Sequence, residues 1–365
     1  MRLAVAGGGT GGHIYPAMAA IEALGHLGVD AQVMWLGVPG GPEESVARGQ
    51  GWEFHPVRAN KVRGSGLRIP ANALAGFAGA VDARRALREF GAEVLLATGG
   101  YVSVPGALGA KLAGVPVLLF LPDASPGWAI RFLRYFADVV AGSSQEAAAS
   151  LGKRTVVTGY PVRRAFLVTD REQAREKMRL GSRPALLVLG GSSGARRLNQ
   201  AVLRWGQDLL GVADIMHVAG RRDYDEVVAE ATSAGLTAHP GYHLYAYLDN
   251  LPEAMVASDL VISRAGAATL GELAAAGRPA VLVPGTFAGG HQRHNAAYLA
   301  QVGCAIVIDD DQVLERLGPA VADLLGDAST LQTMAERARS LAVPDAAERL
   351  ARLLQQTASG GSRAR

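Results

Sequence analysis

The sequence predicts an α/β protein with two domains, each built on a parallel sheet. Short apolar runs alternate with helical segments along almost the whole chain, and apolar runs without polar alternation are typical of strands buried on both faces. Two such runs, near residues 2–6 and 185–189, each precede a glycine-rich turn, GGGTGGH at 7–13 and GGSSGA at 190–195. Such a turn before a helix forms an anion site, because unpaired N–H groups and the helix dipole favour negative charge. One turn in each half predicts paired nucleotide-binding folds facing a cleft.

The order of the elements follows from this alternation. The junction is expected at residues 159–162, after the last strand of the first half, so that residues 1–162 form one domain and 163–341 the other. A final helix is expected over about 346–356, and the Ser- and Gly-rich residues 359–365 are expected to be a disordered tail. The expected strands lie near 2–6, 31–36, 94–97, 116–120, 138–141, 155–158, 185–189, 214–218, 260–262, 280–283 and 305–308.

Bulk properties exclude several classes of protein. No apolar run approaches the ~20 residues needed to cross a bilayer, and the chain opens directly in a strand, so neither a membrane span nor a secretory signal is expected. Cys304 is the single cysteine, which rules out an internal disulfide and fits a reducing cytoplasm. No Cys/His cluster has zinc spacing. The predominance of arginine is typical of a GC-rich genome, and we expect no nucleic-acid partner.

The first half carries the whole net charge of +3. Residues 1–162 hold 14 basic and 11 acidic side chains, whereas 163–365 hold 22 of each. Seven basic residues lie from Arg58 to Arg88, against Asp82 alone. We predict that this stretch docks on an anionic membrane surface; the alternative is a structural helix whose apolar residues face the core. The predicted patch comprises Leu67, Ile69, Leu74, Phe77 and Val81, bordered by Lys61, Arg63, Arg68, Arg84, Arg85 and Arg88.

A dinucleotide-binding site is the first alternative for the N-terminal turn. Such a site carries an acidic residue at the end of the second strand to hold the ribose diol. Here that strand ends at Gly37, and the first acidic residue after it is Glu43. The turn also ends on His13, a titratable group that such a site does not need. The sequence therefore disfavours a dinucleotide cofactor.

Two later loops carry polar groups suited to a sugar nucleotide. After the strand at 260–262, Gly266 turns the chain into a helix, and Glu272 about two turns later can accept hydrogen bonds from both ribose hydroxyls. The alternative is a solvated Glu272 with Arg264 as its surface partner. The loop at 284–295 supplies amide and imidazole groups, which suit neutral sugar hydroxyls. Residues 309–311, three aspartates, could suggest a metal site, but we expect them to cap the following helix.

Together these motifs indicate a family. The chain resembles the MurG-type N-acetylglucosaminyltransferases, which make the last lipid-linked precursor of peptidoglycan, and the resemblance runs nearly end to end. It rests on GGTGGH at 8–13, YVSVPGALGA at 101–110, GYPVR at 159–163, GGSSGARRLN at 190–199, RAGAATLGELAAAG at 264–277, HQRHNA at 291–296 and MAERARSLAVPDAAERLA at 334–351. All of these motifs in this order and spacing make the match specific.

The resemblance implies the GT-B architecture, two Rossmann-like domains with parallel sheets facing a central cleft. The last helix, residues 342–358, is then expected to pack back on the N-terminal domain. The implied donor is UDP-N-acetylglucosamine, held mainly by the C-terminal domain, with no metal and no other cofactor. Glu272 should hold the ribose diol, Gln292 the sugar hydroxyls, and Ser192 and Arg163 the diphosphate. The other implied donor residues are Arg264, Ala267, Ala268 and Thr269.

The implied acceptor is undecaprenyl-diphosphoryl-N-acetylmuramoyl pentapeptide, at the cytoplasmic face of the bacterial cell membrane, where the enzyme is peripheral. The acceptor's C4 hydroxyl displaces UDP in one step, and a base takes its proton. His13 is the preferred base, because imidazole titrates near neutral pH. Asp123 competes for this role, because it replaces the family's asparagine near the sugars. The loop expected to meet the acceptor diphosphate comprises Thr10, Gly11, Gly12, His13 and Tyr101.

The chain departs from the family's pattern at two places. The family usually has His-Glu-Gln-Asn after the fourth strand, where this chain has Phe120, Leu121, Pro122 and Asp123, and Tyr160 stands where asparagine is usual. We expect both changes on the acceptor side or near the sugar. Two alternatives stay open: a related glycosyltransferase acting on a diacylglycerol-type lipid, and a non-catalytic lipid- or nucleotide-binding subunit.

Overall fold

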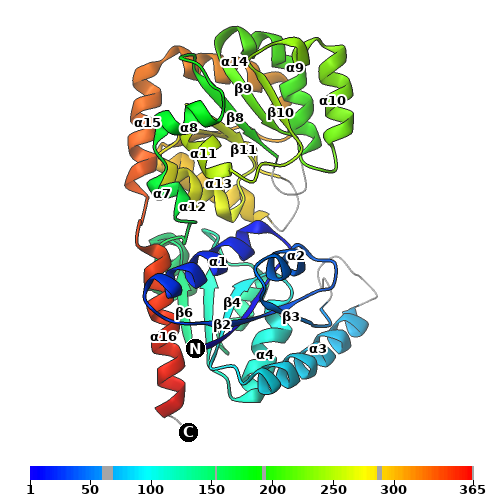
Figure 1. The fold of residues 1–365 in the computed structure, drawn as a ribbon, viewed down its shortest axis with the longest axis vertical. Helices are drawn as coiled ribbons and strands as arrows, with labels where there is room; N and C mark the ends of the chain where they lie inside the picture. Colours follow the sequence, from blue (N-terminus) through cyan, green and yellow to red (C-terminus); the bar gives the residue numbers. More distant parts are fainter. Residues whose placement is uncertain (60–68, 153, 191–194, 286–289, 364–365) are drawn as a thin grey trace. The chain divides into compact units, whose positions relative to one another are not determined.

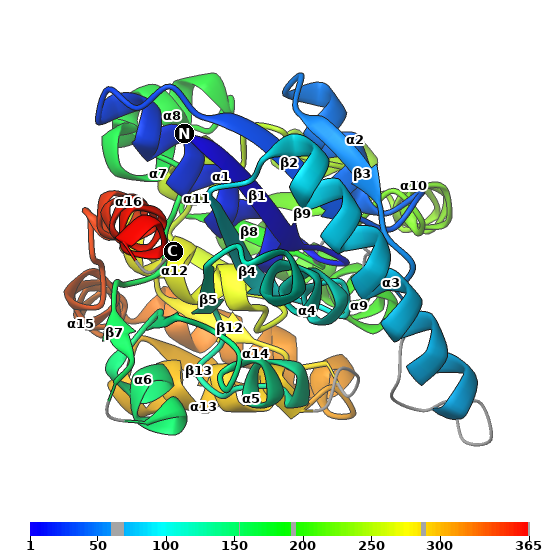
Figure 2. The ribbon, with the colours of Figure 1, turned by 90° about the horizontal axis from the view of Figure 1, so that it is seen from below.

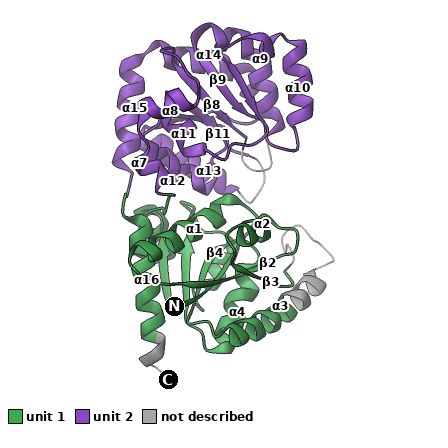
Figure 3. Ribbon diagram, viewed as in Figure 1, with its two compact units in different colours: residues 1–163, 343–365 green, residues 164–342 purple. Residues whose placement is uncertain are grey.

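The computed structural model describes residues 1–59, 69–152, 154–190, 195–285 and 290–363, and within these ranges all side chains except those of 69–75 and 361–363. The chain divides into two compact units (Figure 3). Unit 1 comprises Met1–Arg163 together with Val343–Arg365, and unit 2 comprises Arg164–Ala342. Across the described part of the chain, no helix combines the length and the apolar character needed to span a membrane.

Seven parallel strands form the sheet of unit 1, in the order β3-β2-β1-β4-β5-β6-β7 (Figure 1). The order reverses between β1 and β4, because β2 and β3 lie on one side of β1 and the later strands on the other. The elements of unit 1 are β1 (Arg2–Gly7), α1 (Gly11–His26), β2 (Gln32–Gly37), α2 (Pro42–Gly49), β3 (Glu53–Pro56), α3 (Ile69–Phe90), β4 (Val94–Gly99), α4 (Ser103–Ala113), β5 (Val117–Leu121), α5 (Trp128–Leu133), β6 (Val139–Gly142), α6 (Gln145–Leu151), β7 (Val156–Val157) and α16 (Ala346–Arg363).

The strands of unit 1 bury side chains on both faces of the sheet, as the unbroken apolar runs predict. In β1, Leu3 and Val5 pack into a layer shared with α1 and α16, whereas Ala4 and Ala6 pack into a layer shared with α3 and α4 (Figure 2). The C-terminal helix α16 belongs to the first of these layers. Its buried side chains in that layer are Leu350, Ala351 and Leu354.

Unit 2 repeats the architecture with six parallel strands, in the order β10-β9-β8-β11-β12-β13. Its core joins Leu186 and Val188 of β8 to Val202 of α9 and Leu317 of α14. The elements of unit 2 are α7 (Ala165–Val168), α8 (Arg171–Lys177), β8 (Ala185–Leu189), α9 (Arg196–Val212), β9 (Asp214–Val218), α10 (Tyr224–Ser233), the 3₁₀ helix η2 (Leu236–Ala238), β10 (Tyr242–Tyr245), α11 (Leu251–Ala257), β11 (Leu260–Ser263), α12 (Ala267–Ala276), β12 (Ala280–Leu282), α13 (His291–Val302), β13 (Ala305–Val307), α14 (Val313–Gly326) and α15 (Ala328–Ser340).

Two strands, β3 and β10, are absent from the sequence prediction. Each lies at an edge of its sheet, and their sequences, EFHP and YHLY, are partly exposed rather than continuously apolar. A strand at an edge pairs on one side only and is open to solvent on the other. The sequences of β3 and β10 therefore lack the apolar run that marks a strand buried on both faces, whereas the other two edge strands, β7 (Val156–Val157) and β13 (Ala305–Val307), keep a short one.

The C-terminal helix is longer than predicted, and the expectation of a disordered tail from residue 359 is wrong. Helix α16 continues to Arg363, and residues 364–365 at the end of the expected tail lie outside the described chain. The hydroxyls of Thr357 and Ser359 donate to the carbonyl oxygens of Leu353 (2.7 Å) and Gln355 (2.9 Å), one helical turn earlier. Through these local bonds the hydroxyls are satisfied within the helix. The prediction of a disordered tail rested on Ser- and Gly-rich composition alone and did not include such bonds.

Candidate functional site

In unit 1 the candidate residues gather at the carboxyl edge of the sheet, around the point where the strand order reverses. His13 follows β1, Tyr101 follows β4 and Asp123 follows β5, and these three strands are neighbours in the order β1-β4-β5. In open α/β sheets, ligands bind outside the carboxyl ends of the strands at such a switch point. The sheet topology thus brings together residues that are over a hundred positions apart.

The glycine loop, residues 7–12, joins β1 to α1. Gly9 has φ +80°, which favours glycine, and a Cβ at Gly7 would lie 1.9 Å from the Thr98 hydroxyl oxygen. Thr10 is the N-cap of α1 in an extended conformation, and its side chain makes no capping hydrogen bond. The first N–H groups of α1 are therefore not covered by a side-chain cap, which suits an anion at this helix end.

The His13 ring is oriented by the backbone of this loop. Its Nδ1 lies 3.1 Å from the carbonyl oxygen of Gly8. Because a carbonyl only accepts, Nδ1 carries the hydrogen in the neutral ring, and Nε2 carries the lone pair. The hydroxyl of Thr98 donates to the His13 carbonyl at 2.6 Å and fixes the start of α1. The half-buried imidazole can therefore accept a proton at Nε2.

Tyr101 and Asp123 flank this histidine on the following strands. Tyr101 is half-buried, and its ring lies 3.5 Å from where a Cβ of Gly9 would stand. Burial, and then the charge of Glu43, raise the pKa of the Tyr101 hydroxyl. Asp123 is half-buried after β5, two strands away from the strand that leads to His13. Its carboxylate thus belongs to the same edge.

The departures from the family's pattern, which we expect on the acceptor side or near the sugar, lie mainly in the core of unit 1. Phe120 and Leu121 are both fully buried, on opposite faces of β5. The Phe120 ring meets the Tyr160 ring edge to face, with centroids 6.4 Å apart. Tyr160 in turn donates from its hydroxyl to the Gly12 carbonyl at 3.4 Å. The two aromatic departures therefore pack together beneath the glycine loop, and only Asp123 of this segment is half-exposed.

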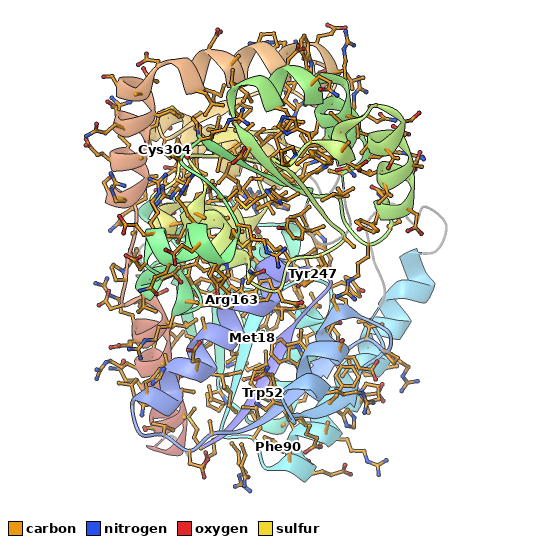
Figure 4. All side chains as sticks on the ribbon, turned by 45° about the horizontal axis from the view of Figure 1, so that its top comes forward. Met18, Trp52, Phe90, Arg163, Tyr247 and Cys304 are labelled. Atoms are coloured by element: carbon orange, nitrogen blue, oxygen red, sulfur yellow. The ribbon has the colours of Figure 1, made fainter. Side chains whose placement is uncertain are left out.

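Of the two residues predicted to bind the donor diphosphate, Arg163 and Ser192, the structure describes only Arg163. Arg163, labelled in Figure 4, is the last residue of the first segment of unit 1, although we placed it in the second domain. Its guanidinium lies over the Tyr15 ring, 5.0 Å from the centroid. Ser192 lies outside the described residues, as do the other residues of 191–194.

In unit 2 the candidate donor residues surround the start of α12. Gly266 is the N-cap, in an extended conformation with no side-chain cap, and Ala267 and Ala268 form the first turn. The Thr269 hydroxyl donates to the Arg264 carbonyl at 3.0 Å. As in unit 1, a glycine turn leads from a buried strand into a helix whose first N–H groups lack a side-chain cap, and this suits a phosphate.

The question left open about Glu272 and Arg264 is settled by their surroundings. Glu272 is 7% exposed, so it is not a solvated helix residue. Arg264 pairs with Asp310 (Nη1 to Oδ1, 2.5 Å) and donates to the Val283 carbonyl at 3.0 Å. Its Nε is buried and has no hydrogen-bond partner among the described residues. Glu272 in the second turn of α12 is thus a buried carboxylate, and Arg264, three residues before the helix, is a partly buried guanidinium.

The three aspartates at 309–311 do not cap α14, contrary to the expectation. The N-cap is Gln312, which makes no side-chain cap, and the first turn contains only Glu315 as an acidic residue. Asp310 is used instead by Arg264, a partner 46 positions away that no local pattern shows. Within the described ranges, no three His, Cys, Asp or Glu residues are grouped as a metal site would need.

The loop before α13 contributes an oriented amide. The Gly285 N–H donates to Oε1 of Gln292 at 2.7 Å, which fixes which end of this side chain is the oxygen. Asn295, fully buried, donates from Nδ2 to the Ala265 carbonyl at 3.1 Å. The start of α13 is thereby tied to the turn before α12. Sequence reasoning missed this role, although Asn295 belongs to the quoted HQRHNA motif.

A second missed group is a buried polar network between α9 and the strands β9 and β10 of unit 2. His217 of β9 lies 3.1 Å from Oδ1 of Asn199 on α9 and 2.9 Å from the Tyr242 hydroxyl. Asn199 also donates to the Ala219 carbonyl at 3.0 Å. Burial lowers the pKa of His217 to about 3, so the ring is neutral, and burial raises the pKa of Tyr242. This network joins the first turn of α9 to the sheet.

Comparison with known proteins places the chain in a family. The model of the glycosyltransferase family 28 N-terminal domain matches residues 3–141, and that of the C-terminal domain matches residues 185–350. A protein of Halorhodospira halophila is 39% identical over 98% of this chain and 99% of its own length. One of Halothermothrix orenii is 34% identical over 99% and 100%. Both are named UDP-N-acetylglucosamine–N-acetylmuramyl-(pentapeptide) pyrophosphoryl-undecaprenol N-acetylglucosamine transferase.

Solved structures agree with this placement. The crystal structure of Acinetobacter baumannii MurG is 28% identical, with a TM-score of 0.75 over 97% of this chain and 99% of that chain. A glycosyltransferase of kitacinnamycin, 17% identical with a TM-score of 0.71 over 98% of each chain, shares the fold. The expected GT-B fold is confirmed. The chain therefore belongs to glycosyltransferase family 28 and, within it, to the MurG-type N-acetylglucosaminyltransferases.

Proposed function

We propose that this protein transfers N-acetylglucosamine from UDP-N-acetylglucosamine to the C4 hydroxyl of undecaprenyl-diphospho-N-acetylmuramoyl pentapeptide, the step from lipid I to lipid II in peptidoglycan synthesis. The observation that carries the proposal is 34–39% identity along nearly the full length to proteins named for this reaction. The polar groups at the ends of β1 and β11 supply a base and a sugar-nucleotide site of the required kinds.

The donor lies at unit 2. The buried Glu272 carboxylate accepts hydrogen bonds from the ribose diol, and the N–H groups of Ala267, Ala268 and Thr269 meet the diphosphate and sugar. The unpartnered Nε of Arg264 supports a polar ligand beside it. Gln292 binds the sugar hydroxyls. The resemblance also implies diphosphate contacts from Ser192, outside the described residues, and from Arg163, which belongs to unit 1.

The transfer is a single displacement. The acceptor C4 oxygen forms a bond to the anomeric carbon, the bond from that carbon to the UDP oxygen breaks, and the α-linked sugar becomes β-linked. The hydroxyl proton goes to Nε2 of His13, and the electron pair of the broken bond leaves with UDP. Charge on the leaving phosphate is stabilised by N–H groups at a helix end and by arginine, so the proposal requires no metal or other cofactor.

The acceptor lies at unit 1. The N–H groups of Thr10, Gly11 and Gly12 meet its diphosphate, since the start of α1 carries no side-chain cap. Tyr101 lines the same loop. Asp123, on the strand beyond β4, orients a sugar hydroxyl and is the weaker candidate for the base.

Unit 1 docks on the cytoplasmic face of the cell membrane as a peripheral protein. On α3, Phe77 is 66% and Val81 45% exposed, and Arg85 and Arg88 are exposed beside them. Leu112 of α4, 53% exposed, extends this surface next to Arg84, which donates to its carbonyl at 3.2 Å. The basic excess is smaller than the sequence suggests, because Arg58 is paired with Asp82 and Arg85 with Glu89. Lys61, Arg63, Leu67 and Arg68, and the side chains of Ile69 and Leu74, lie outside the described part.

A transfer assay tests the proposal directly. Labelled UDP-N-acetylglucosamine is incubated with a short-chain analogue of the muramoyl lipid and, in parallel, with diacylglycerol. Label is expected in the muramoyl lipid alone. Transfer to diacylglycerol alone would establish the related lipid glycosyltransferase instead, and the absence of transfer and donor hydrolysis from a folded, UDP-binding protein would establish a non-catalytic subunit.

A further inference from the structure

Glu43 is a fully buried carboxylate that the proposed reaction does not use. It lies in the first turn of α2 and reaches the glycine loop, 34 positions earlier in the chain. The Gly9 N–H donates to Oε2 at 3.0 Å, and the Val38 N–H donates to Oε1 at 3.1 Å. Each carboxylate oxygen therefore holds one backbone N–H, one in each of two loops at the carboxyl edge of the sheet.

The surrounding glycines make room for this carboxylate. A Cβ at Gly8 would lie 2.4 Å from Cδ of Glu43, a Cβ at Gly41 2.6 Å from its Oε1, and a Cβ at Gly37 2.7 Å from its Cγ. Real Cβ atoms do not approach other atoms so closely. The three glycines thus form the cavity that Glu43 fills, so the acid is built into the loop.

The peptide group between Gly8 and Gly9 connects Glu43 to His13. Its N–H donates to the Glu43 carboxylate at 3.0 Å, and its carbonyl accepts from Nδ1 of His13 at 3.1 Å. A charged acceptor on the N–H polarises the peptide and strengthens the carbonyl as an acceptor, because hydrogen bonds in a chain reinforce one another. The arrangement is a carboxylate–histidine pair with one peptide group inserted between its members; in directly bonded pairs the carboxylate fixes the tautomer and orientation of the ring.

We propose that Glu43 is a positioning residue for His13, which acts through the Gly8–Gly9 peptide to hold Nδ1–H on the Gly8 carbonyl and to present Nε2 to the acceptor hydroxyl. This inference rests on the proposed function, in which His13 takes the proton. Glu43 itself touches neither substrate nor reacting atoms. Its charge reaches the same edge of the sheet, where it contributes to the raised pKa of Tyr101.

The first test compares two neighbouring carboxylates. Glu43→Gln keeps the shape of the side chain but replaces one acceptor oxygen with a donor NH₂, and we expect kcat to fall by about 10- to 100-fold, the scale for a partner that orients a functional histidine. The KM for UDP-N-acetylglucosamine should stay within about two-fold, as that site lies in unit 2. Glu44→Gln is the matched control: its carboxylate accepts from Gly40 N–H at 2.8 Å and pairs with Arg48, but makes no bond to the glycine loop. An equal loss in both variants would overturn the proposal.

A double-mutant cycle separates positioning from general structural support. If Glu43 acts through His13, Glu43→Gln should lower kcat by less than about three-fold when His13 is already alanine, since residues that act as a unit are non-additive. The same loss in both backgrounds would show that Glu43 acts independently of His13 and would overturn the inference. If His13→Ala alone retains most of the turnover, the assignment of the base fails instead, so the two failures are distinguishable.

A third pair of variants perturbs the carboxylate without removing it. Gly41 has φ −73° and ψ 157°, which alanine adopts without strain, so Gly41→Ala pushes only on the Glu43 carboxylate. Gly49, at the other end of α2, has open space around a Cβ. Gly41→Ala should lower kcat by about ten-fold and Gly49→Ala should not, with UDP affinity unchanged in both as evidence of folding. Equal activity of these two variants would contradict the proposal, even if Glu43→Gln does not fold.

Discussion

Backbone groups orient the side chains that carry the chemistry. The Gly8 carbonyl orients the ring of His13, and the Gly285 N–H orients the amide of Gln292. Neither contact can be predicted from the residue types in the sequence. Every residue has a backbone carbonyl, and every residue except proline has a backbone N–H. The sequence therefore indicates which side chains act, whereas the loop conformations decide which of their atoms face a ligand.

Removal of the imidazole tests the base. His13→Ala should lower turnover by about 10²- to 10⁴-fold, the usual scale of general-base catalysis, with little change in donor affinity. His26→Ala, an exposed histidine at the other end of α1, serves as the control and should retain full activity. Steady-state kinetics measure the turnover of both variants and, for comparison, that of Asp123→Asn. A loss of this size in Asp123→Asn, with most of the turnover kept in His13→Ala, would reverse the two roles.

Removal of the buried carboxylate on α12 tests the donor site. Glu272→Ala should leave ribose hydroxyls unpaired and weaken UDP binding by roughly 1.5–3 kcal/mol, the scale for hydrogen bonds to charged groups. Calorimetric titration with UDP measures this loss. Glu230→Ala, an exposed glutamate on α10 of the same unit, should bind UDP like the wild type. Unchanged affinity in Glu272→Ala would refute the assignment.

The buried histidine of unit 2 predicts an acid-dependent loss of stability. Its pKa is about 3 in the fold, against an ordinary value of 6.5, so the unfolded chain binds a proton that the folded chain does not. The free energy of unfolding should therefore decrease as the pH falls from about 6.5 toward 3, by up to about 1.4 kcal/mol per pH unit from this residue. When denaturant unfolding is measured at several pH values, the free energy of unfolding of His217→Gln should change with pH along a shallower slope than that of the wild type. Identical slopes for both proteins would argue against a neutral, buried His217.

Among the elements, α16 stands out because the chain returns through it to unit 1. Leu350 and Leu354 are fully buried there, in the layer that also contains Leu3 and Val5 of β1. An amphipathic helix gains most of its stability from such packing rather than from its own propensity. The final helix is thus part of the core of unit 1.

Truncation of one of these leucines tests the role of α16. Leu354→Ala should destabilise unit 1 by about 2–5 kcal/mol, because a large buried side chain is replaced by a cavity. Gln356→Ala, at an exposed position two residues later, should change stability by less than about 0.5 kcal/mol. Unfolding of the full chain followed by tryptophan fluorescence and calorimetry resolves the two variants. Equal stability of both would show that α16 contributes little to the core.

At the scale of the whole molecule, the proposed membrane attachment depends on a surface rather than on a single site. Val81 of α3 and Val212 of α9 are exposed to similar extents, 45% and 42%, but only Val81 lies in the predicted patch. Val81→Asp should therefore reduce co-sedimentation with anionic vesicles several-fold, and Val212→Asp should not. Higher salt should weaken binding by the wild type, since each basic residue near the surface contributes about 1 kcal/mol. Binding that ignores both salt and anionic lipid would contradict the docking surface.

Much of the molecule follows from local sequence. Apolar runs locate the central strands, and glycine turns after β1 and β11 locate the starts of α1 and α12, where His13 and Glu272 are found. These features depend on residues within one or two turns of each other, so a pattern in the sequence is sufficient. The edge strands β3 and β10 were not predicted, because their partly exposed sequences, EFHP and YHLY, have no continuous apolar pattern.

The sequence by itself determined the fold class, the family and the chemical types at both sites. Only the tertiary structure decided their partners: Glu43 with Gly9, 34 positions apart, and Arg264 with Asp310, 46 positions apart. It also placed Phe120 against Tyr160 in the core, at two positions where the chain departs from the family's pattern. The physical reason is that periodicity and turn chemistry are local, whereas such contacts arise only after strand order and loop conformation have brought distant segments to one edge of a sheet.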